Sequence, residues 1–199
     1  MITVGITGGV GAGKSEVLKY IAKRLDCEVM VADRFAEELE MRGNVCYEPL
    51  VSLLGEDVLS NNLEIDRKRM SFLIFSNPSL LAKVNEIVHP AVKTGVIKRI
   101  EELKEEGSKS FFFLEAALLI ECGYKEVLDE LWYVYADEDT RRKRLKASRG
   151  YSDEKVDKIL ASQLSDAIFA ANADFIIDNS GNLENTYKIV DSRLKSYKI

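Results

Sequence analysis

Histidine, cysteine and proline are scarce in this chain of 199 residues, and each scarcity excludes a class of protein. The one histidine is His89, so a metal site built from several histidines is ruled out. The three cysteines, Cys27, Cys46 and Cys122, are odd in number and widely spaced, which fits neither a disulfide framework nor a zinc site. The three prolines and 12 glycines form no low-complexity linker. We therefore expect a globular protein in a reducing cytoplasm.

The sequence also lacks long hydrophobic runs and an excess of positive charge. No segment approaches the roughly 18 apolar residues of a membrane span, because Glu115 interrupts the longest apolar stretch. The N-terminus does not resemble a signal peptide. The 28 Lys and Arg against 33 Asp and Glu give a net charge of −5, which argues against a broad nucleic-acid surface but allows a local basic pocket. We expect one domain with a small insertion, and neither a membrane nor a nucleic-acid partner.

Short β-rich segments alternate with amphipathic helical segments along the chain. Strands are predicted at residues 2–7, 28–32, 111–114, 131–136 and 174–177. Apolar spacing and capping residues predict helices at 15–25, 33–41, 66–74, 78–89, 90–106, 137–146, 152–164 and 183–197, with an irregular stretch at 43–62. This alternation predicts a parallel sheet with helices on both faces. The segment 34–106 exceeds a normal crossover, so we expect it to be an inserted substrate-binding subdomain.

A glycine-rich segment between the first strand and the first helix matches the phosphate-loop pattern G-x-x-x-x-G-K-[ST]. Its residues are Gly8, Gly9, Val10, Gly11, Ala12, Gly13, Lys14 and Ser15. Glycines let backbone N–H groups converge on phosphate oxygens, and the following helix adds the dipole of its N-terminus. Lys14 would place a positive charge at the β- and γ-phosphates, and the Ser15 hydroxyl would join the shell of a Mg²⁺ ion. The alternative is a plain strand–helix turn with an exposed lysine, and the agreement of motif and context argues against it.

A phosphate loop alone does not choose among kinases, GTPases and motor ATPases. The chain has no N-K-x-D segment of the kind that reads guanine. An oligomeric ATPase is normally longer and carries a second acidic strand motif. A compact chain with an insertion after the second strand therefore favours a small-molecule kinase.

Asp33 and a basic run in the second half of the chain each allow two roles. Asp33 follows the second strand, where α/β proteins bind ligands, but the same position explains a helix cap. The basic residues at 141–149 fit a solvated helix balanced by acidic residues at 137–139. They also fit a lid that brings arginine onto a transferring phosphoryl group. We expect most of them to be solvated.

Six segments, in a fixed order along the chain, resemble those of a known family. They are 4–15, Asp33, His89-Pro90, the segment 115–121 (Glu-Ala-Ala-Leu-Leu-Ile-Glu), Gln163, and the segment 173–181 (Ala-Asp-Phe-Ile-Ile-Asp-Asn-Ser-Gly). Together they resemble the dephospho-coenzyme A kinase family over nearly the whole chain. The resemblance implies transfer of the ATP γ-phosphoryl group to the ribose 3′-hydroxyl of dephospho-CoA, which gives CoA and ADP in the last step of coenzyme A biosynthesis. It implies ATP and Mg²⁺ as cofactors, and a monomer or weak homo-oligomer is expected.

The resemblance also implies an architecture and a set of site residues. The fold would be the α/β P-loop kinase type, in three α/β/α layers with a five-stranded parallel sheet. Its core would be 1–33, 107–136 and 165–199, its acceptor-binding helical insertion about 34–106, and its small lid about 137–164. The catalytic residues would be Asp33, Lys14, Arg144 and Arg149. The nucleotide would be bound by Gly9, Val10, Gly11, Ala12, Gly13, Lys14, Ser15, Glu16, Asn179 and Gly181. The acceptor would be bound by Asp33, His89, Glu115 and Leu118, and Mg²⁺ by Ser15, with Glu115 as a second candidate ligand.

Several positions depart from the family pattern. Glu115 replaces the usual aspartate, and Ala117 replaces the usual proline. Glu16 stands where threonine is common, and Phe169 where lysine is frequent. The second lid arginine of the family matches Ser148 or, with a shift of one residue, Arg149. The rival functions are another small-molecule kinase, such as a nucleoside or nucleotide kinase, and a regulatory protein that holds ATP without transferring phosphate.

Overall fold

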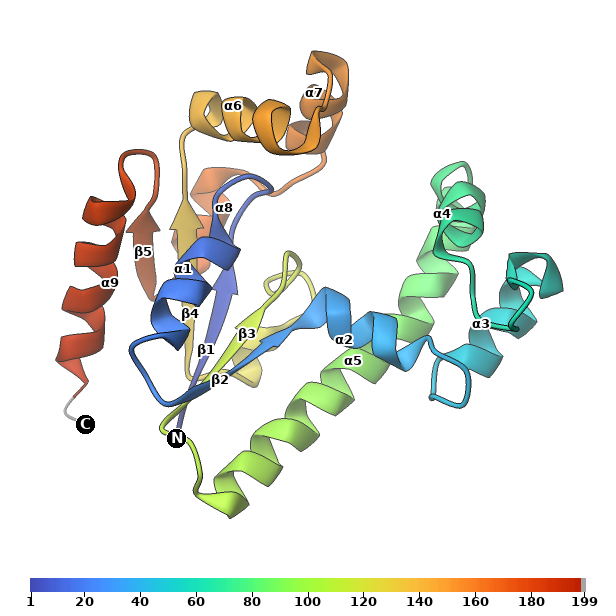
Figure 1. The fold of residues 1–199 in the computed structure, drawn as a ribbon, viewed down its shortest axis with the longest axis horizontal. Helices are drawn as coiled ribbons and strands as arrows, with labels where there is room; N and C mark the ends of the chain where they lie inside the picture. Colours follow the sequence, from blue (N-terminus) through green and yellow to red (C-terminus); the bar gives the residue numbers. More distant parts are fainter. Residues whose placement is uncertain (198–199) are drawn as a thin grey trace. The chain divides into compact units, whose positions relative to one another are not determined.

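The computed structural model describes residues 1–197, which divide into two compact units (Figure 1). The first unit comprises residues 1–30 and the chain from residue 103 onward, and the second comprises Val31–Glu102. Within residues 1–197, no helix has both the length and the apolar character needed to span a bilayer. Each unit is described in turn.

The first unit is built on a five-stranded parallel sheet, as the sequence predicts. Its strands are β1 (Ile2–Thr7), β2 (Cys27–Val31), β3 (Phe111–Glu115), β4 (Glu130–Tyr135) and β5 (Phe175–Asp178). They lie in the order β2-β3-β1-β4-β5. β1 is central: Val4 lies opposite Phe113 of β3 on one side and Glu130 of β4 on the other. The carboxyl ends of these strands share one edge of the sheet, and the glycine-rich loop leaves β1 at that edge.

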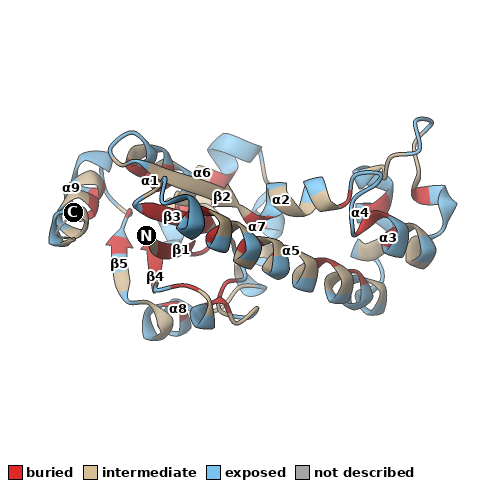
Figure 2. Ribbon diagram, turned by 90° about the horizontal axis from the view of Figure 1, so that it is seen from below, coloured by how far each residue is buried: buried red, intermediate tan, exposed pale blue. Residues whose placement is uncertain are grey.

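Both faces of the sheet are covered by helices (Figures 1 and 2). The helices of this unit are α1 (Lys14–Ala22), α6 (Glu138–Arg149), α7 (Asp153–Ala161), α8 (Asp166–Asn172) and α9 (Leu183–Ser196), with a 3₁₀ turn at Tyr124–Glu126. Side chains alternate between the faces of a strand. Trp132 accordingly joins the core formed with α1 and α9, while its neighbour Tyr133 stacks on Phe169 of α8 at 5.0 Å between ring centroids. The predicted three-layer α/β/α arrangement is confirmed.

Side-chain caps set the helix boundaries between β4 and β5, and one prediction there is wrong. Asp137 caps α6 by accepting from the Thr140 N–H at 2.8 Å, and Ser152 caps α7, as the sequence indicates. The helix predicted to continue to residue 164 ends instead at Ala161. A separate helix, α8, then begins, because the Ser165 hydroxyl accepts from the Ile168 N–H and caps a new start.

The second unit is helical. It contains α2 (Ala32–Leu39), α3 (Tyr47–Leu54), a 3₁₀ turn at Glu56–Val58, α4 (Arg67–Phe75) and α5 (Pro78–Glu106), the last of which runs on into the first unit. Asp66 caps α4 by accepting from the Lys68 and Arg69 N–H groups, and Asn77 accepts from the Leu80 N–H at the start of α5. Both helix starts are predicted correctly from the sequence.

Residues 78–106 form one continuous helix, so the predicted break at Pro90 is wrong. A proline inside a helix removes a hydrogen bond and costs about 3 kcal/mol. This helix nevertheless buries apolar side chains at regular intervals of four residues. They are Val84, Val88, Val92, Val96 and Ile100. At roughly 1.5–3 kcal/mol for each fully buried side chain, that stripe outweighs the cost of the proline.

Two further expectations about the second unit are wrong. The stretch 43–62, predicted to be irregular, contains α3. Pro49 lies in the first turn of that helix, where the backbone N–H has no intrahelical partner to lose, and Gly55 ends it with φ of 83°. Asp33 does not cap α2, because Val31 occupies the cap position and makes no side-chain capping bond. The Asp33 carboxylate lies instead in the first turn of α2 and is exposed.

Candidate active site

The loop between β1 and α1 has the backbone conformation that its glycines predict. Gly8, Gly11 and Gly13 have φ of 142°, 84° and 95°, a region that L side chains rarely adopt. Gly13 precedes α1, and its carbonyl accepts from the Glu16 and Val17 N–H groups, so the helix begins directly at the loop. The loop therefore presents donors and the positive end of a helix dipole at the carboxyl edge of the sheet.

Three cationic side chains, those of Lys14, Arg141 and Arg144, donate hydrogen bonds to carbonyl groups of this loop. The acceptors are five successive carbonyl groups, those of Gly8, Gly9, Val10, Gly11 and Ala12. Because a trans peptide unit is planar, each N–H points away from the carbonyl of the preceding residue. The cations thereby fix the direction of the loop N–H groups and concentrate positive charge around them, which suits a polyphosphate.

Lys14 and Arg144 hold opposite ends of the loop. The Lys14 ammonium lies 2.8 Å from the Gly8 carbonyl oxygen. Arg144 Nη1 lies 3.3 Å from the Ala12 carbonyl oxygen, and its Nη2 donates to the Asn179 carbonyl at 2.8 Å. Arg144 thus lies directly against the phosphate loop. Its proposed action on a transferring phosphoryl group stays a prediction.

Asn179, the residue after β5, is buried and uses its side chain to fix the loop. Its Nδ2 donates to the Ala12 carbonyl at 2.7 Å, and its Oδ1 accepts from the Thr186 hydroxyl at 2.9 Å. A Cβ atom at Gly13 would collide with this amide, so Gly13 is required by close packing as well as by its φ. The contact of Asn179 with adenine stays a prediction. In the structure, the Asn179 amide holds the loop in place through its bond to the Ala12 carbonyl.

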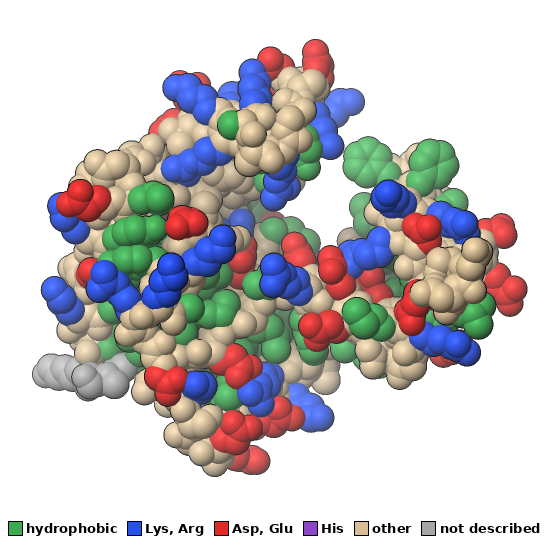
Figure 3. All heavy atoms as spheres, in the orientation of Figure 1, with side chains coloured by type: hydrophobic (Ala, Val, Ile, Leu, Met, Phe, Trp, Pro, Cys, Tyr) green, Lys and Arg blue, Asp and Glu red, His purple; other side chains and the backbone are tan. Residues whose placement is uncertain are grey.

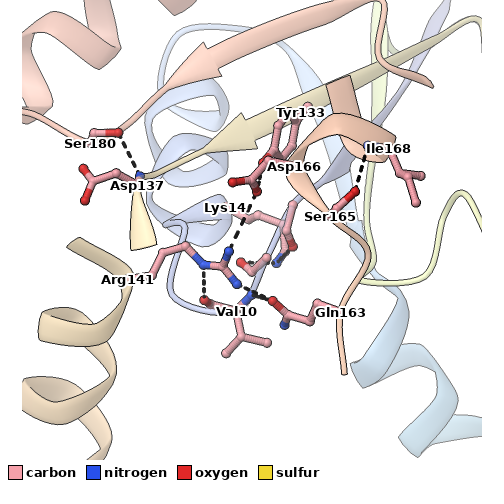
Figure 4. Close-up of polar contacts among 12 residues, drawn as sticks. Val10, Lys14, Tyr133, Asp137, Arg141, Gln163, Ser165, Asp166, Ile168 and Ser180 are labelled. Atoms are coloured by element: carbon pink, nitrogen blue, oxygen red, sulfur yellow. Dashed lines mark hydrogen bonds and ion pairs between the residues drawn. The ribbon is translucent and has the colours of Figure 1, made fainter. Parts of the chain in front are cut away.

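Most residues of the basic run 141–149 are expected from the sequence to be solvated, but the Arg141 side chain lies against the loop and the residue is 8% exposed. Its Nε donates to the Val10 carbonyl at 3.1 Å, and its Nη2 donates to Gln163 Oε1 (Figure 4). The sequence carries a signal for this placement. Arg141 lies one helical turn before the buried Leu145, so both belong to the inward face of α6.

An acidic and a phenolic group complete the surroundings of Arg141. Asp166 Oδ1 lies 4.0 Å from Arg141 Nη1 and accepts from the Tyr133 hydroxyl at 2.7 Å (Figure 4). Burial raises the pKa of Tyr133, and the hydrogen bond to Asp166 raises this pKa further. Tyr133 is therefore a neutral donor at physiological pH, and it holds the Asp166 carboxylate in place beside the guanidinium.

Ser15 and Glu115 come together although 100 residues separate them in the chain. The Ser15 hydroxyl lies 3.3 Å from both carboxylate oxygens of Glu115, which is the last residue of β3. Among residues 1–197, no three His, Cys, Asp or Glu side chains gather into a metal site. A hydroxyl and a single carboxylate instead fit a Mg²⁺ ion that takes its remaining ligands from water and nucleotide phosphates.

The remaining predicted site residues of the first unit have other side-chain surroundings. Arg149 lies at the end of α6, where its guanidinium is 5.9 Å from the centre of the Tyr151 ring. Glu16 accepts from the Tyr187 hydroxyl at 3.0 Å. Leu118 and Gly181 are exposed.

Two of the residues predicted to bind the substrate that accepts the phosphoryl group belong to the second unit. Asp33 lies in α2, as described above, and His89 is half-buried in α5 beside Pro90. On the same unit, Gly95 packs so closely on the Phe35 ring that a Cβ there would collide with it, which seats α2 against α5. Asp33 lies on the helix, α2, that this contact packs against α5.

Comparison with known proteins identifies the family. A family model described as dephospho-CoA kinase matches residues 2–185. The chain belongs to the dephospho-CoA kinase family. It is 36% identical over 192 residues to a dephospho-CoA kinase of Streptococcus mutans, covering 96% of each chain. It is 35% identical over 191 residues to that of Geobacter sulfurreducens, again covering 96% of each chain.

Solved structures agree with the fold of this dephospho-CoA kinase family member. The protein TT1252 from Thermus thermophilus superposes with a TM-score of 0.82 at 26% identity, covering 100% of this chain and 98% of that one. Dephospho-CoA kinase from Campylobacter jejuni gives a TM-score of 0.72 at 22% identity, covering 98% and 96%. Shikimate kinase from Acinetobacter baumannii gives 0.62 at 14% identity, covering 100% and 96%. The predicted P-loop kinase fold and membership of a kinase family are both confirmed.

Proposed function

We propose that this protein transfers the γ-phosphoryl group of ATP to the ribose 3′-hydroxyl of dephospho-CoA, giving CoA and ADP. The observation that carries the proposal is the family match across residues 2–185, which coincides with a phosphate loop surrounded by three cationic side chains. Phosphoryl transfer relies on positioning and on electrostatic stabilisation more than on covalent chemistry by the protein. A loop held in a fixed conformation by cations supplies both.

The nucleotide would be held by Lys14 and by those loop N–H groups that do not already bond within the protein, as the Val10 and Ala12 N–H groups do. Lys14 would exchange its bond to the Gly8 carbonyl for the β- and γ-phosphates when ATP binds, and Arg144 would stabilise the charge of the transferring group. Mg²⁺, when bound through Ser15 and Glu115, would neutralise charge that develops on the phosphate oxygens. The proposal also includes two further contacts. Asn179 and Gly181 would contact the adenine, and Arg149 would contact a phosphate.

The acceptor would be bound by Asp33, His89 and Leu118, with Glu115 as a further contact. Asp33 is the group proposed to orient the 3′-hydroxyl and accept its proton. Its exposed carboxylate makes no helix-capping bond, so it keeps its acceptor capacity. We further propose a monomer or weak homo-oligomer in the cytoplasm, which gel filtration and cell fractionation would test.

A substrate panel tests the proposed function directly. The purified protein is incubated with Mg·ATP and, separately, with dephospho-CoA, nucleosides, nucleoside monophosphates and shikimate. We expect CoA and ADP in equal amounts from dephospho-CoA, and little product from the other acceptors. Faster phosphorylation of another acceptor would favour the rival small-molecule kinase. ATP binding without any transfer would favour the regulatory protein.

Replacement of Glu115 by glutamine tests the proposed Mg²⁺ site. The amide keeps the shape of the side chain but removes its negative charge, so the Mg²⁺ concentration for half-maximal rate should rise by roughly 10-fold. Initial rates measured against Mg²⁺ at fixed ATP give this value. Glu115→Asp, which restores the usual family residue, should keep a requirement near that of the wild type. The exposed Glu126→Gln is the control, and an unchanged requirement in Glu115→Gln would contradict the metal role.

A further inference from the structure

The peptide groups on both sides of Val10 are held by side chains from the segment 137–164. The Val10 N–H donates to Gln163 Oε1 at 3.3 Å, and the Val10 carbonyl accepts from Arg141 Nε at 3.1 Å. Arg141 also donates to the same Gln163 oxygen, so the three residues form a closed ring of hydrogen bonds (Figure 4). Val10 lies in the middle of the loop, between the glycine pair 8–9 and the segment 11–13.

We propose that Arg141 and Gln163 act as a positioning pair that clamps Val10 and so sets the phosphate loop in its ATP-binding conformation before the nucleotide arrives. This inference rests on the proposed function, since it takes the loop to be the ATP site. Neither residue is assigned a contact with substrate. They act by holding the loop. Because Gln163 follows α7, the position of the segment after α7 thereby affects the conformation of the loop that binds the nucleotide.

The geometry requires a guanidinium at position 141. The planar fork donates through Nε to Val10 and through Nη2 to Gln163, while Nη1 faces Asp166 at 4.0 Å. A lysine has a single nitrogen on a flexible stem and cannot hold partners in this fixed plane. Gly9 fits the same geometry, because a Cβ atom there would overlap the Arg141 guanidinium.

A glycine-rich loop needs such a clamp because its backbone is otherwise free to adopt many conformations. Gly8, Gly9, Gly11 and Gly13 make the loop flexible in the absence of other restraints, and ordering such residues costs conformational entropy. If the ordering is completed during folding, ATP does not have to supply it during binding. The loss of Arg141 should therefore appear as weaker nucleotide binding, even though the residue does not touch the nucleotide.

The test measures the affinity of a non-hydrolysable ATP analogue with a β–γ imido bridge, by calorimetry in the presence of Mg²⁺. Arg141→Met should weaken binding about 10-fold, equal to about 1.4 kcal/mol. Arg141→Lys, which keeps the charge, should lose nearly as much. Arg142→Met is the matched control, because Arg142 pairs with Glu138 and Asp157 on the outer face of α6, and it should bind as the wild type does.

Wild-type affinity in Arg141→Lys would overturn the clamp, because charge alone would then suffice. An equal loss in Arg142→Met would also overturn it. If Arg141→Met does not fold, Gln163→Leu carries the test and should show the same weakening, and wild-type affinity there would refute the proposal. The double variant Arg141→Lys/Gln163→Leu should lose no more than the larger single loss, since both residues act through Val10. These outcomes need no acceptor, so phosphorylation of another substrate would refute the proposed function and leave the clamp standing.

Discussion

Lys14→Ala is expected to reduce kcat/KM for ATP by roughly 10³-fold or more, because the residue has two tasks. In the structure its ammonium binds the Gly8 carbonyl at 2.8 Å and helps to hold the loop. In the reaction it would supply a positive charge to the β- and γ-phosphates, and no other residue of the proposed site can replace that charge from the same position. Steady-state rates at varied ATP would show the loss in both kcat and KM.

The matched control for Lys14→Ala is Lys19→Ala. Lys19 is exposed on the same helix, α1, and its loss should leave the rate unchanged. Thermal unfolding of the two variants should agree within a few degrees, because neither side chain belongs to the apolar core. Lys14→Arg should also fail, since a guanidinium is larger than an ammonium and its donors lie in a fixed plane. Retention of more than a tenth of the wild-type rate in Lys14→Ala would contradict the proposed phosphate site.

The sheet could be predicted from the sequence because its three central strands, β1, β3 and β4, are buried on both faces and its edge strands are also rich in apolar residues. Such strands are short β-rich segments bounded by glycines or polar residues, and all five were located to within two residues. The loop between β1 and α1 could be predicted because its pattern is fixed by the need for positive φ and close approach. Both features depend on residue types that lie close together in the sequence, so a sequence pattern can reveal them.

The errors arise where burial, or the exact position of a residue in a helix turn, overrides a simple sequence signal. Pro90 is a strong helix breaker, yet α5 continues past it, because burial of the valine and isoleucine stripe outweighs the cost of the proline. Pro49 also suggests irregular structure, but it lies in a first turn that tolerates proline. Ser165 was not recognised as a cap, because the apolar spacing of the preceding helix continues to Leu164. The α5 error therefore comes from burial of the helix face, and the other two come from the exact position of a residue in a turn.

The candidate site was only partly predictable for the same reason. A motif position predicts a site role for Arg144, and this residue contacts the loop. The same kind of motif position predicts a site role for Arg149, yet its guanidinium lies 5.9 Å from the centre of the Tyr151 ring. Arg141 belongs to no motif, and only the periodicity relative to the buried Leu145 distinguishes it from its solvated neighbours. The pairing of Ser15 with Glu115 follows from the parallel register of β1 and β3, which places Ile6 opposite Glu115 at the edge where the loop begins.

Asp33→Asn is expected to lower kcat by roughly 10²- to 10⁴-fold while the KM for ATP changes little. The amide keeps the size of the carboxylate but cannot accept the proton of the 3′-hydroxyl. A loss confined to kcat is the signature of a group that acts in the transition state rather than in nucleotide binding. Initial rates at saturating dephospho-CoA and varied ATP would separate the two parameters.

A structural role for Asp33 makes a different prediction. The carboxylate lies in the first turn of α2 without a capping bond, so its loss removes only a favourable interaction with the helix dipole, worth about 0.3–1 kcal/mol. Glu38→Gln, an exposed change on the same helix, is the control and should keep the wild-type rate. Asp33→Glu keeps the charge but moves it by one methylene, and should recover part of the rate lost in Asp33→Asn. Equal losses in kcat and ATP affinity, together with a lower melting temperature, would show that Asp33 supports the fold, because a proton acceptor has no reason to alter either nucleotide binding or stability.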